Sequence, residues 1–232
     1  MNAAGTDAKM RNTKESILEA QFTSGAGNWC TWMFGRDLVN WNNNFTWAKW
    51  VTPSRDLISA FKQEGDEVRF KESIVYYDCN WSNYYPSDNY PFMYKCRSAN
   101  SSIIKYRYAD VLLLKAEALI MQDTPDLEGA ADIIDEVRDR AKLGALPTSV
   151  RSNKNVLLNA LLKERRLELA FEGQRWFDLV RLDKVEEVMN AVYSKDSGRK
   201  AQIYTFDKNS YRLPIPQSVI DANDKIHQNP GY

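Results

Sequence analysis

The chain has 232 residues, 44% of them hydrophobic, which is enough to bury the core of one large domain or two small ones. Its 31 basic and 31 acidic residues cancel, and no block of like charge is present, so nucleic acid is excluded as an expected partner. No stretch approaches the roughly 18 apolar residues of a membrane-spanning helix, and the first residues lack the charged and apolar regions of a signal peptide. We therefore expect a soluble chain.

Cysteine and histidine usage limits the chemistry that the chain can perform. Cys30, Cys79 and Cys96 lie far apart and form no CxxC pair, so buried free thiols are expected. His227 is the single histidine, which rules out a site built from several histidines and makes a structural or exposed side chain the expectation. No nucleotide-binding glycine motif or nucleophile elbow occurs. The sequence predicts no cofactor, no metal ion and no catalytic residue.

The first part of the chain, up to about residue 100, is rich in Trp, Tyr, Asn and Ser and lacks a sustained helical period. It predicts long loops with a few short elements. The residues of Ser16–Phe22 favour a half-buried strand. A short helix is expected over residues 53–62, because Ser54 can cap its first turn and Gly65 follows its last.

A further strand is expected over Glu67–Tyr77. Its apolar residues, Val68, Phe70, Ile74 and Val75, are interleaved with charged residues before an aromatic loop begins. The alternation breaks midway along this segment.

After Lys105 the pattern changes to helical spacing. From Tyr108 a wide apolar stripe at intervals of three and four residues predicts a long helix. Pro125 and Asp126 begin a second helix, which Gly144 is expected to end. The short link over residues 122–124 predicts that these two helices are antiparallel.

Two more helices are expected downstream. The third begins near Asn155 and runs to Phe171, and Gly173 separates it from a fourth that runs from Arg175 to about Val188. Two successive pairs with alanines at close contacts indicate helical-repeat packing of the tetratricopeptide kind over residues 104–193.

The tail and the overall organisation follow. Leu213–Pro216 must be extended because of its two prolines, and a helical turn is expected over Gln217–Ala222. The predicted fold class is mainly α, with tetratricopeptide-like helix pairs, an extensive irregular, aromatic-rich loop region and little β structure. Residues 1–103 are the expected loop region and residues 104–232 the helical region, together forming one structural unit.

Four segments, in this order, give the chain a specific resemblance to a known family. They are Tyr108–Ala118, Glu164–Arg181, Leu213–Pro216 and Gln228–Tyr232. Together they resemble the C-terminal part of SusD-like (RagB/SusD family) proteins. Lys14–Phe22 is similar to the strand that follows the first helical half in that family. Family members are typically about twice this length and carry a lipidated N-terminal cysteine.

The resemblance implies a function. It implies capture of an oligosaccharide or polysaccharide at the surface of a bacterial outer membrane, with a lipid anchor outside this chain. It also implies delivery of the glycan to a SusC-like TonB-dependent transporter as partner, with the helices facing that transporter. On this interpretation the protein binds its ligand and is not an enzyme.

The aromatic loops contain the candidate ligand-binding residues. Sugar rings expose apolar C–H faces between hydroxyls, so a binder needs flat aromatic rings for stacking and short amide or carboxylate groups for the hydroxyls. Trp and Asn interleave in these loops, although any single aromatic residue is more often a packing residue. The candidates are Trp29, Trp32, Trp41, Trp47, Trp81, Tyr84 and Tyr85.

Two rival functions remain open. Glu164, Glu168 and Glu172 stand four residues apart, which could provide a carboxylate pair for glycoside hydrolysis. The alternative interpretation of these glutamates is a network of ion pairs that fixes helix packing. Arg165 precedes Glu168 by three residues, and Arg175, Asp178 and Arg181 follow one another at the same spacing. The other rival is a helical-repeat scaffold that binds a protein partner and has no ligand of its own.

Overall fold

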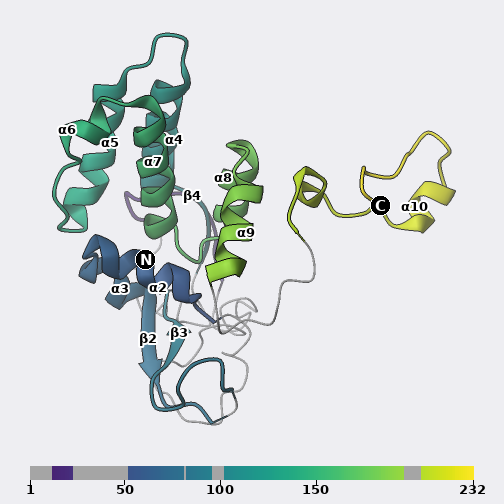
Figure 1. Cartoon of the computed structure of the whole chain (residues 1–232), viewed down its shortest axis with the longest axis horizontal. Helices are drawn as coiled ribbons and strands as arrows, with labels where there is room; N and C mark the ends of the chain where they lie inside the picture. The colour runs from purple at the N-terminus through teal and green to yellow at the C-terminus, as the bar shows by residue number, and fades with distance from the viewer. Residues whose placement is uncertain (1–11, 23–51, 81, 96–101, 196–204) are drawn as a thin grey trace. The chain divides into compact units, whose positions relative to one another are not determined.

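The computed structural model (Figure 1) describes the chain in five stretches, residues 12–22, 52–80, 82–95, 102–195 and 205–232. The chain divides into two compact units between Gln174 and Arg175, and each unit is described by itself. The expected division at residue 103 into two parts of one structural unit stays a prediction.

Three helices form the main core of the first unit. α4 (Tyr108–Met121) lies against α5 (Leu127–Arg140) and α7 (Lys154–Glu168), and the short α6 (Thr148–Arg151) lies between them in sequence (Figure 1). Small side chains at the contact allow α4 and α5 to approach closely. The fully buried residues are Leu113, Ala116, Ile120, Ala130, Ala131, Ile134, Leu157 and Leu161. The predicted helix pair is confirmed.

α2 (Arg55–Glu64) also matches its prediction. The hydroxyl of Ser54 accepts a hydrogen bond from the Leu57 backbone N–H at 3.1 Å, as an N-cap does. Gly65 ends the helix with φ 70°, a left-handed conformation that glycine adopts without a steric penalty. Ile58 and Phe61 are buried beneath the helix.

The strand expected over Glu67–Tyr77 is wrong in its first part. Glu67–Ser73 form a helix, α3, and only Ile74–Tyr77 form a strand, β2. The side chain of Asp66 accepts from the Arg69 backbone N–H at 3.1 Å and caps the helix. Phe70 packs on the cluster that α2 buries, so tertiary packing overrides a weak strand pattern.

The described strands form two small antiparallel pairs. β1 (Ser16–Ala20) pairs with β4 (Ile103–Arg107), which confirms the first predicted strand, although Ile17 and Leu18 are exposed and the strand is not half-buried as expected. β2 pairs with β3 (Tyr90–Met93) in a register that places Tyr77 opposite Tyr90. All four residues of β3 are buried, so this hairpin belongs to the core and projects its connecting loop outward.

The second unit contains two helices where one was predicted. α8 (Arg175–Arg181) and α9 (Val185–Lys195) are separated by a turn in which Asp183 has φ 53°. Aspartate tolerates this left-handed conformation better than most residues, so the chain turns without a glycine or proline. The unit continues with the 3-10 helix η4 (Lys208–Tyr211) and with α10 (Gln217–Asp221), which confirms the predicted turn there.

The ends of two other helices also differ from expectation. α5 ends at Arg140 and not at Gly144, because Lys142 takes a left-handed φ of 63°. α7 ends at Glu168, since Phe171 has φ 65° and Gly173 has φ 81°. Glu172 therefore does not continue the helix face of Glu164 and Glu168.

Two segments of the tail that carry the family resemblance lie together in the second unit. The side-chain amide of Gln228 donates to the Ile215 carbonyl at 2.9 Å and accepts from the Ile215 N–H at 2.8 Å. Asn229 donates to the Leu213 carbonyl at 2.7 Å. These amides satisfy an extended, proline-containing segment that has no strand partner of its own among the described residues.

The predicted class, mainly α with little β structure, is confirmed. Within the five described stretches, no helix is long and apolar enough to cross a membrane.

The core assignment yields a first prediction. Leu161→Ala should lower the free energy of unfolding by about 2–5 kcal/mol, because Leu161 is fully buried between helices and its removal leaves a cavity. Val156→Ala, on an exposed position of the same helix, should change it by less than about 0.5 kcal/mol. Chemical denaturation followed by circular dichroism measures both. Equal effects would contradict this core.

Candidate functional site

The loop between β2 and β3 borders an open cavity of about 790 Å³. Amide, hydroxyl and aromatic side chains gather there, and those of Asn80 and Asn83 are exposed. The lining includes Asn80, Ser82, Asn83, Tyr84, Tyr85 and Pro86. The cavity therefore combines ring surfaces with short hydrogen-bonding groups.

Tyr84 and Tyr85 are held in place from α2. Their rings meet edge to face with centroids 4.9 Å apart. The guanidinium carbon of Arg55 lies 4.1 Å from the Tyr84 ring centroid and 4.5 Å from that of Tyr85, and its Nη2 donates to the Tyr84 carbonyl. The Tyr85 hydroxyl donates to the Pro53 carbonyl at 2.8 Å. The rings are thus preorganised before any ligand arrives.

The base of the loop is fixed from the strand side. Tyr90, at the start of β3, donates its hydroxyl to the Ser82 hydroxyl at 3.2 Å. Cys79 is buried as a free thiol, as predicted, and its backbone N–H donates to the Ser87 carbonyl at 2.6 Å. These contacts close the loop on itself, so its side chains keep a defined spacing.

The predicted binding residues divide into two groups. Tyr84 and Tyr85 lie together at the cavity. The other five lie outside the described residues, namely Trp29, Trp32, Trp41, Trp47 and Trp81. Arg55 was not predicted, because a helix pattern gives no indication that an arginine stacks on a loop far along the chain.

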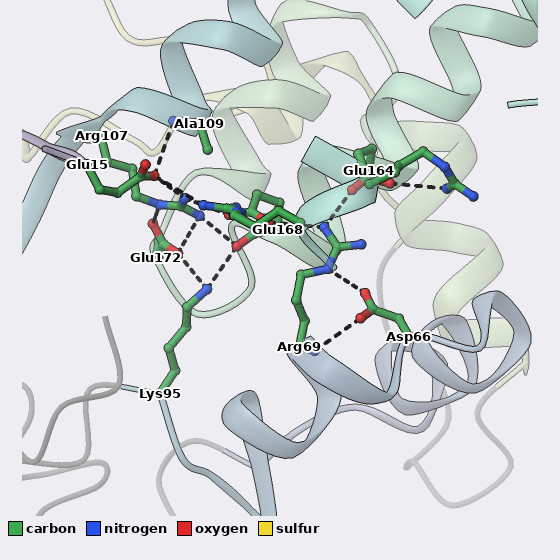
Figure 2. A network of polar contacts seen from close by, with 11 residues as sticks. Glu15, Asp66, Arg69, Lys95, Arg107, Ala109, Glu164, Glu168 and Glu172 are labelled. Atoms are coloured by element: carbon green, nitrogen blue, oxygen red, sulfur yellow. Dashed lines mark hydrogen bonds and ion pairs between the residues drawn. The ribbon is translucent and has the colours of Figure 1, made fainter. Parts of the chain in front are cut away.

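The carboxylates singled out in the sequence belong to a different place, a buried ion-pair network (Figure 2). Glu168 lies at its centre with a side chain 5% exposed. Its carboxylate contacts Arg107 at 2.6 Å and Arg69 at 3.1 Å, and it also pairs with Arg140. Three elements other than its own helix therefore converge on one carboxylate.

Arg107 connects the network to the strands. Its guanidinium binds Glu172 through two nitrogens, at 2.7 and 3.0 Å, and reaches Glu15 at 2.8 Å. Lys95, just after β3, contacts Glu172 at 2.6 Å and donates to the Glu168 carbonyl at 2.9 Å (Figure 2). Paired geometry of this kind is needed to offset the desolvation of buried charges.

Neighbouring pairs extend the network through the helices. Glu164 is buried and contacts Arg69 at 2.5 Å, and Arg165 reaches Asp110 on α4 at 2.9 Å. Separately, and within the second unit alone, Asp178 pairs with Arg181 at 2.9 Å, at the predicted spacing of three residues. The interpretation of these charges as architecture is supported by their burial and pairing.

Burial and pairing act in opposite directions on the two central glutamates. Burial alone would raise the pKa of Glu168, but Arg107, Arg140 and Lys95 outweigh it and hold that pKa well below the ordinary value of 4.5. For Glu164 the loss of hydration dominates and raises the pKa, although Arg69 and Arg138 oppose it. Neither carboxylate lines the cavity at the β2–β3 loop, and both are engaged in buried ion pairs, which favours the ion-pair alternative over the hydrolytic pair.

The sequence analysis also considered the single histidine and a metal site. His227 is exposed. Among the described residues, no group of three or more histidine, cysteine, aspartate or glutamate side chains could hold a metal ion.

Comparison with known proteins identifies the family. A sequence model of the SusD family matches residues 88–232, more than half of the chain. The chain belongs to the SusD family. The match includes β3, the network residues of α7 and the tail, and it begins after Tyr84 and Tyr85.

Curated relatives within the SusD family come from Formosa agariphila. SusD-like protein P38 is 43% identical over 99 residues, which cover 40% of this chain and 19% of that protein. SusD-like protein P2 is 36% identical over 143 residues, covering 59% of this chain and 27% of that protein. The matched part is thus about a quarter or less of each relative.

Solved structures share the fold over the whole chain. A SusD superfamily protein of Parabacteroides distasonis matches with a TM-score of 0.74 and 22% identity, covering 100% of this chain and 53% of that one. Surface glycan-binding protein A of Bacteroides thetaiotaomicron matches with a TM-score of 0.69 and 19% identity, covering 99% of this chain and 55% of that one. A structure named laminarin binding SusD-like protein matches with a TM-score of 0.60 and 25% identity, covering 100% of this chain and 52% of that one.

The network yields a second prediction. Glu168→Gln should destabilise the chain by about 3 kcal/mol, because it removes the charge that compensates Arg107 and Arg69 in a buried position. Lys71→Gln breaks an exposed pair with Glu67 and should cost less than about 1 kcal/mol. Urea denaturation at neutral pH compares the two. A Glu168→Gln effect as small as that of Lys71→Gln would contradict a stabilising network.

A third prediction concerns pH. Because folding lowers the pKa of Glu168, its stabilising contribution is complete above the ordinary value of 4.5 and is lost as the pH falls below it. The stability difference between the wild type and Glu168→Gln should therefore shrink from neutral pH toward pH 3. Denaturation series at several pH values measure it, and a constant difference would show that Glu168 is not held by cations.

Proposed function

We propose that this SusD-family chain binds an oligosaccharide or polysaccharide at the β2–β3 loop without catalysing a reaction. The observation that carries the proposal is the open cavity where Tyr84 and Tyr85 lie beside Asn80 and Asn83. Aromatic rings provide flat apolar faces for the C–H side of a sugar ring, and amides match its hydroxyls.

Preorganisation supports this function. The two tyrosine rings are fixed by Arg55 and by the Pro53 carbonyl, so little side-chain entropy remains to be lost on binding. Side chains that are already held in one geometry cost less free energy to order on binding, so a rigid platform raises affinity.

The dimensions of the cavity also fit. At about 790 Å³ it falls within the roughly 300–1,000 Å³ typical of small-molecule sites. Its open form allows a chain to continue beyond the bound sugar units, as a polysaccharide requires. The tryptophans Trp29, Trp32, Trp41, Trp47 and Trp81 are proposed as further ligand contacts; Trp81 is next to Asn80 and Ser82 in the sequence.

The names of related proteins agree with a sugar ligand. One solved neighbour is named as laminarin binding and another as a surface glycan-binding protein. From the family we propose a location on the outer surface of the bacterial outer membrane and delivery of the glycan to a SusC-like TonB-dependent transporter. The buried, paired state of Glu164 and Glu168 supports binding without hydrolysis.

The fourth prediction tests glycan binding. Affinity electrophoresis and calorimetry against plant, host and microbial polysaccharides should identify at least one ligand. Asn83→Ala and Trp81→Ala should each weaken binding at least about tenfold, the equivalent of ~1.4 kcal/mol, through loss of a hydrogen bond or a stacking surface.

Tyr106→Ala is the matched control, because Tyr106 is an exposed aromatic residue on β4 that does not line the cavity. It should bind as the wild type does. Equal weakening in all three variants would argue against this site. Absence of any glycan binding, together with capture of a purified transporter, would favour the scaffold function.

A further inference from the structure

A second cavity, with a volume of about 290 Å³, is built from three separate parts of the chain. Ile58 and Lys62 come from α2, Tyr76 comes from β2, and Pro86 and Asn89 come from the β2–β3 loop. Folding therefore brings helix, strand and loop side chains together around one concave surface.

Three polar side chains at this cavity are available to a ligand. They are the ammonium of Lys62, the hydroxyl of Tyr76 and the amide of Asn89, and none of them forms a hydrogen bond or an ion pair with another described residue. Polar groups in a folded protein that lack such a partner are otherwise satisfied by water or by a ligand. Each of the three belongs to a different element, so their convergence arises from the tertiary structure.

The three groups provide both donors and acceptors. Lys62 donates, whereas the Asn89 amide and the Tyr76 hydroxyl can each donate and accept. Burial raises the pKa of Tyr76, so its hydroxyl keeps its proton at neutral pH. A sugar hydroxyl also donates and accepts, so this mixed set suits a neutral sugar better than it suits a group that only accepts.

Apolar surface completes the lining. Ile58 is 8% exposed, and Pro86 and the ring of Tyr76 add further apolar atoms. Arg55 also lines the cavity, but its guanidinium is engaged by two tyrosine rings and by the Tyr84 carbonyl, so it belongs to the wall. The cavity thus combines an apolar surface for the C–H groups of a sugar ring with polar groups for its hydroxyls.

The size of the cavity limits what it can hold. Its volume of about 290 Å³ is at the lower end of the roughly 300–1,000 Å³ typical of small-molecule sites and well below the 790 Å³ of the first cavity. A single sugar unit therefore suits it better than an oligosaccharide.

We propose that this cavity is a second, separate binding site that holds one neutral sugar unit. The inference rests on the proposed glycan-binding function, because the ligand class is the same, and it adds a second point of attachment. Each cavity binds by itself, so no passage between the two is required. A polysaccharide long enough to reach both would bind more tightly than either contact alone allows, since the second contact forms at a high effective concentration.

Monosaccharides provide the fifth prediction, because they probe each cavity without a long ligand. Glucose, galactose, mannose, xylose, arabinose and fucose are titrated separately into the isotope-labelled chain, and backbone amide signals are followed by NMR. At least one sugar should shift the signals of Lys62 and Asn89 in a saturable way. The signals of Asn80 and Asn83 report on the first cavity in the same spectra.

Variants locate the effect. Asn89→Ala and Tyr76→Phe should each weaken binding of that sugar at this cavity at least about threefold, which is within the range expected for one lost hydrogen bond. Asn89 is exposed, and Tyr76→Phe keeps the ring, so both variants should fold. Asn159→Ala is the matched control, because Asn159 is exposed on α7 and lines neither cavity, and it should leave the affinity unchanged.

The outcomes separate the two proposals. Shifts at Asn80 and Asn83 without shifts at Lys62 and Asn89 would overturn the second site and leave the first intact. The second site would also be overturned if neither Asn89→Ala nor Tyr76→Phe weakened binding, or if no sugar shifted any of these signals. Shifts at Lys62 and Asn89 alone would support the second site and count against the first.

Discussion

The fold depends on the charge cluster in which Arg107 and Glu168 meet. Glu168 ends α7, Arg107 precedes α4, and Arg69 reaches Glu168 from α3, so one buried carboxylate connects the helical core with the α2–α3 segment. Buried charges require their partners at defined distances, because an unpaired one is strongly destabilising. The cluster therefore fixes geometry more strictly than apolar packing, which tolerates many arrangements of similar volume. Arg69 attaches α3 to this cluster, and α2 contacts α3.

The proposed ligand site is built on that fixed geometry. α2 carries Arg55, which stacks on Tyr84 and Tyr85 and connects the scaffold to the loop. Loops between core strands can change side chains without disturbing the core, whereas the network cannot. Under the proposed function, this division explains how one fold can present different binding surfaces, and why family membership alone does not specify the sugar.

The segments that identify the family are architectural. Glu164, Glu168 and Glu172 hold the helices and strands together, and Gln228 and Asn229 satisfy the backbone of the extended tail. Their side chains are committed to protein partners. Strong resemblance in these segments therefore reports the fold, whereas the ligand chemistry that we propose depends on the residues around the β2–β3 loop.

The sequence by itself determined the long helices, because their apolar spacing and the cap at Ser54 are local signals. It also indicated Tyr84 and Tyr85 as candidate ligand-binding residues, because they are adjacent in an aromatic loop. Only tertiary structure made Glu67–Ser73 helical and paired Arg69 with Glu168, residues 99 positions apart. Tertiary structure likewise stacked the Arg55 guanidinium on the rings of Tyr84 and Tyr85. The physical reason is that periodicity and capping act within a few residues, whereas charge pairing and stacking depend on which surfaces folding brings together.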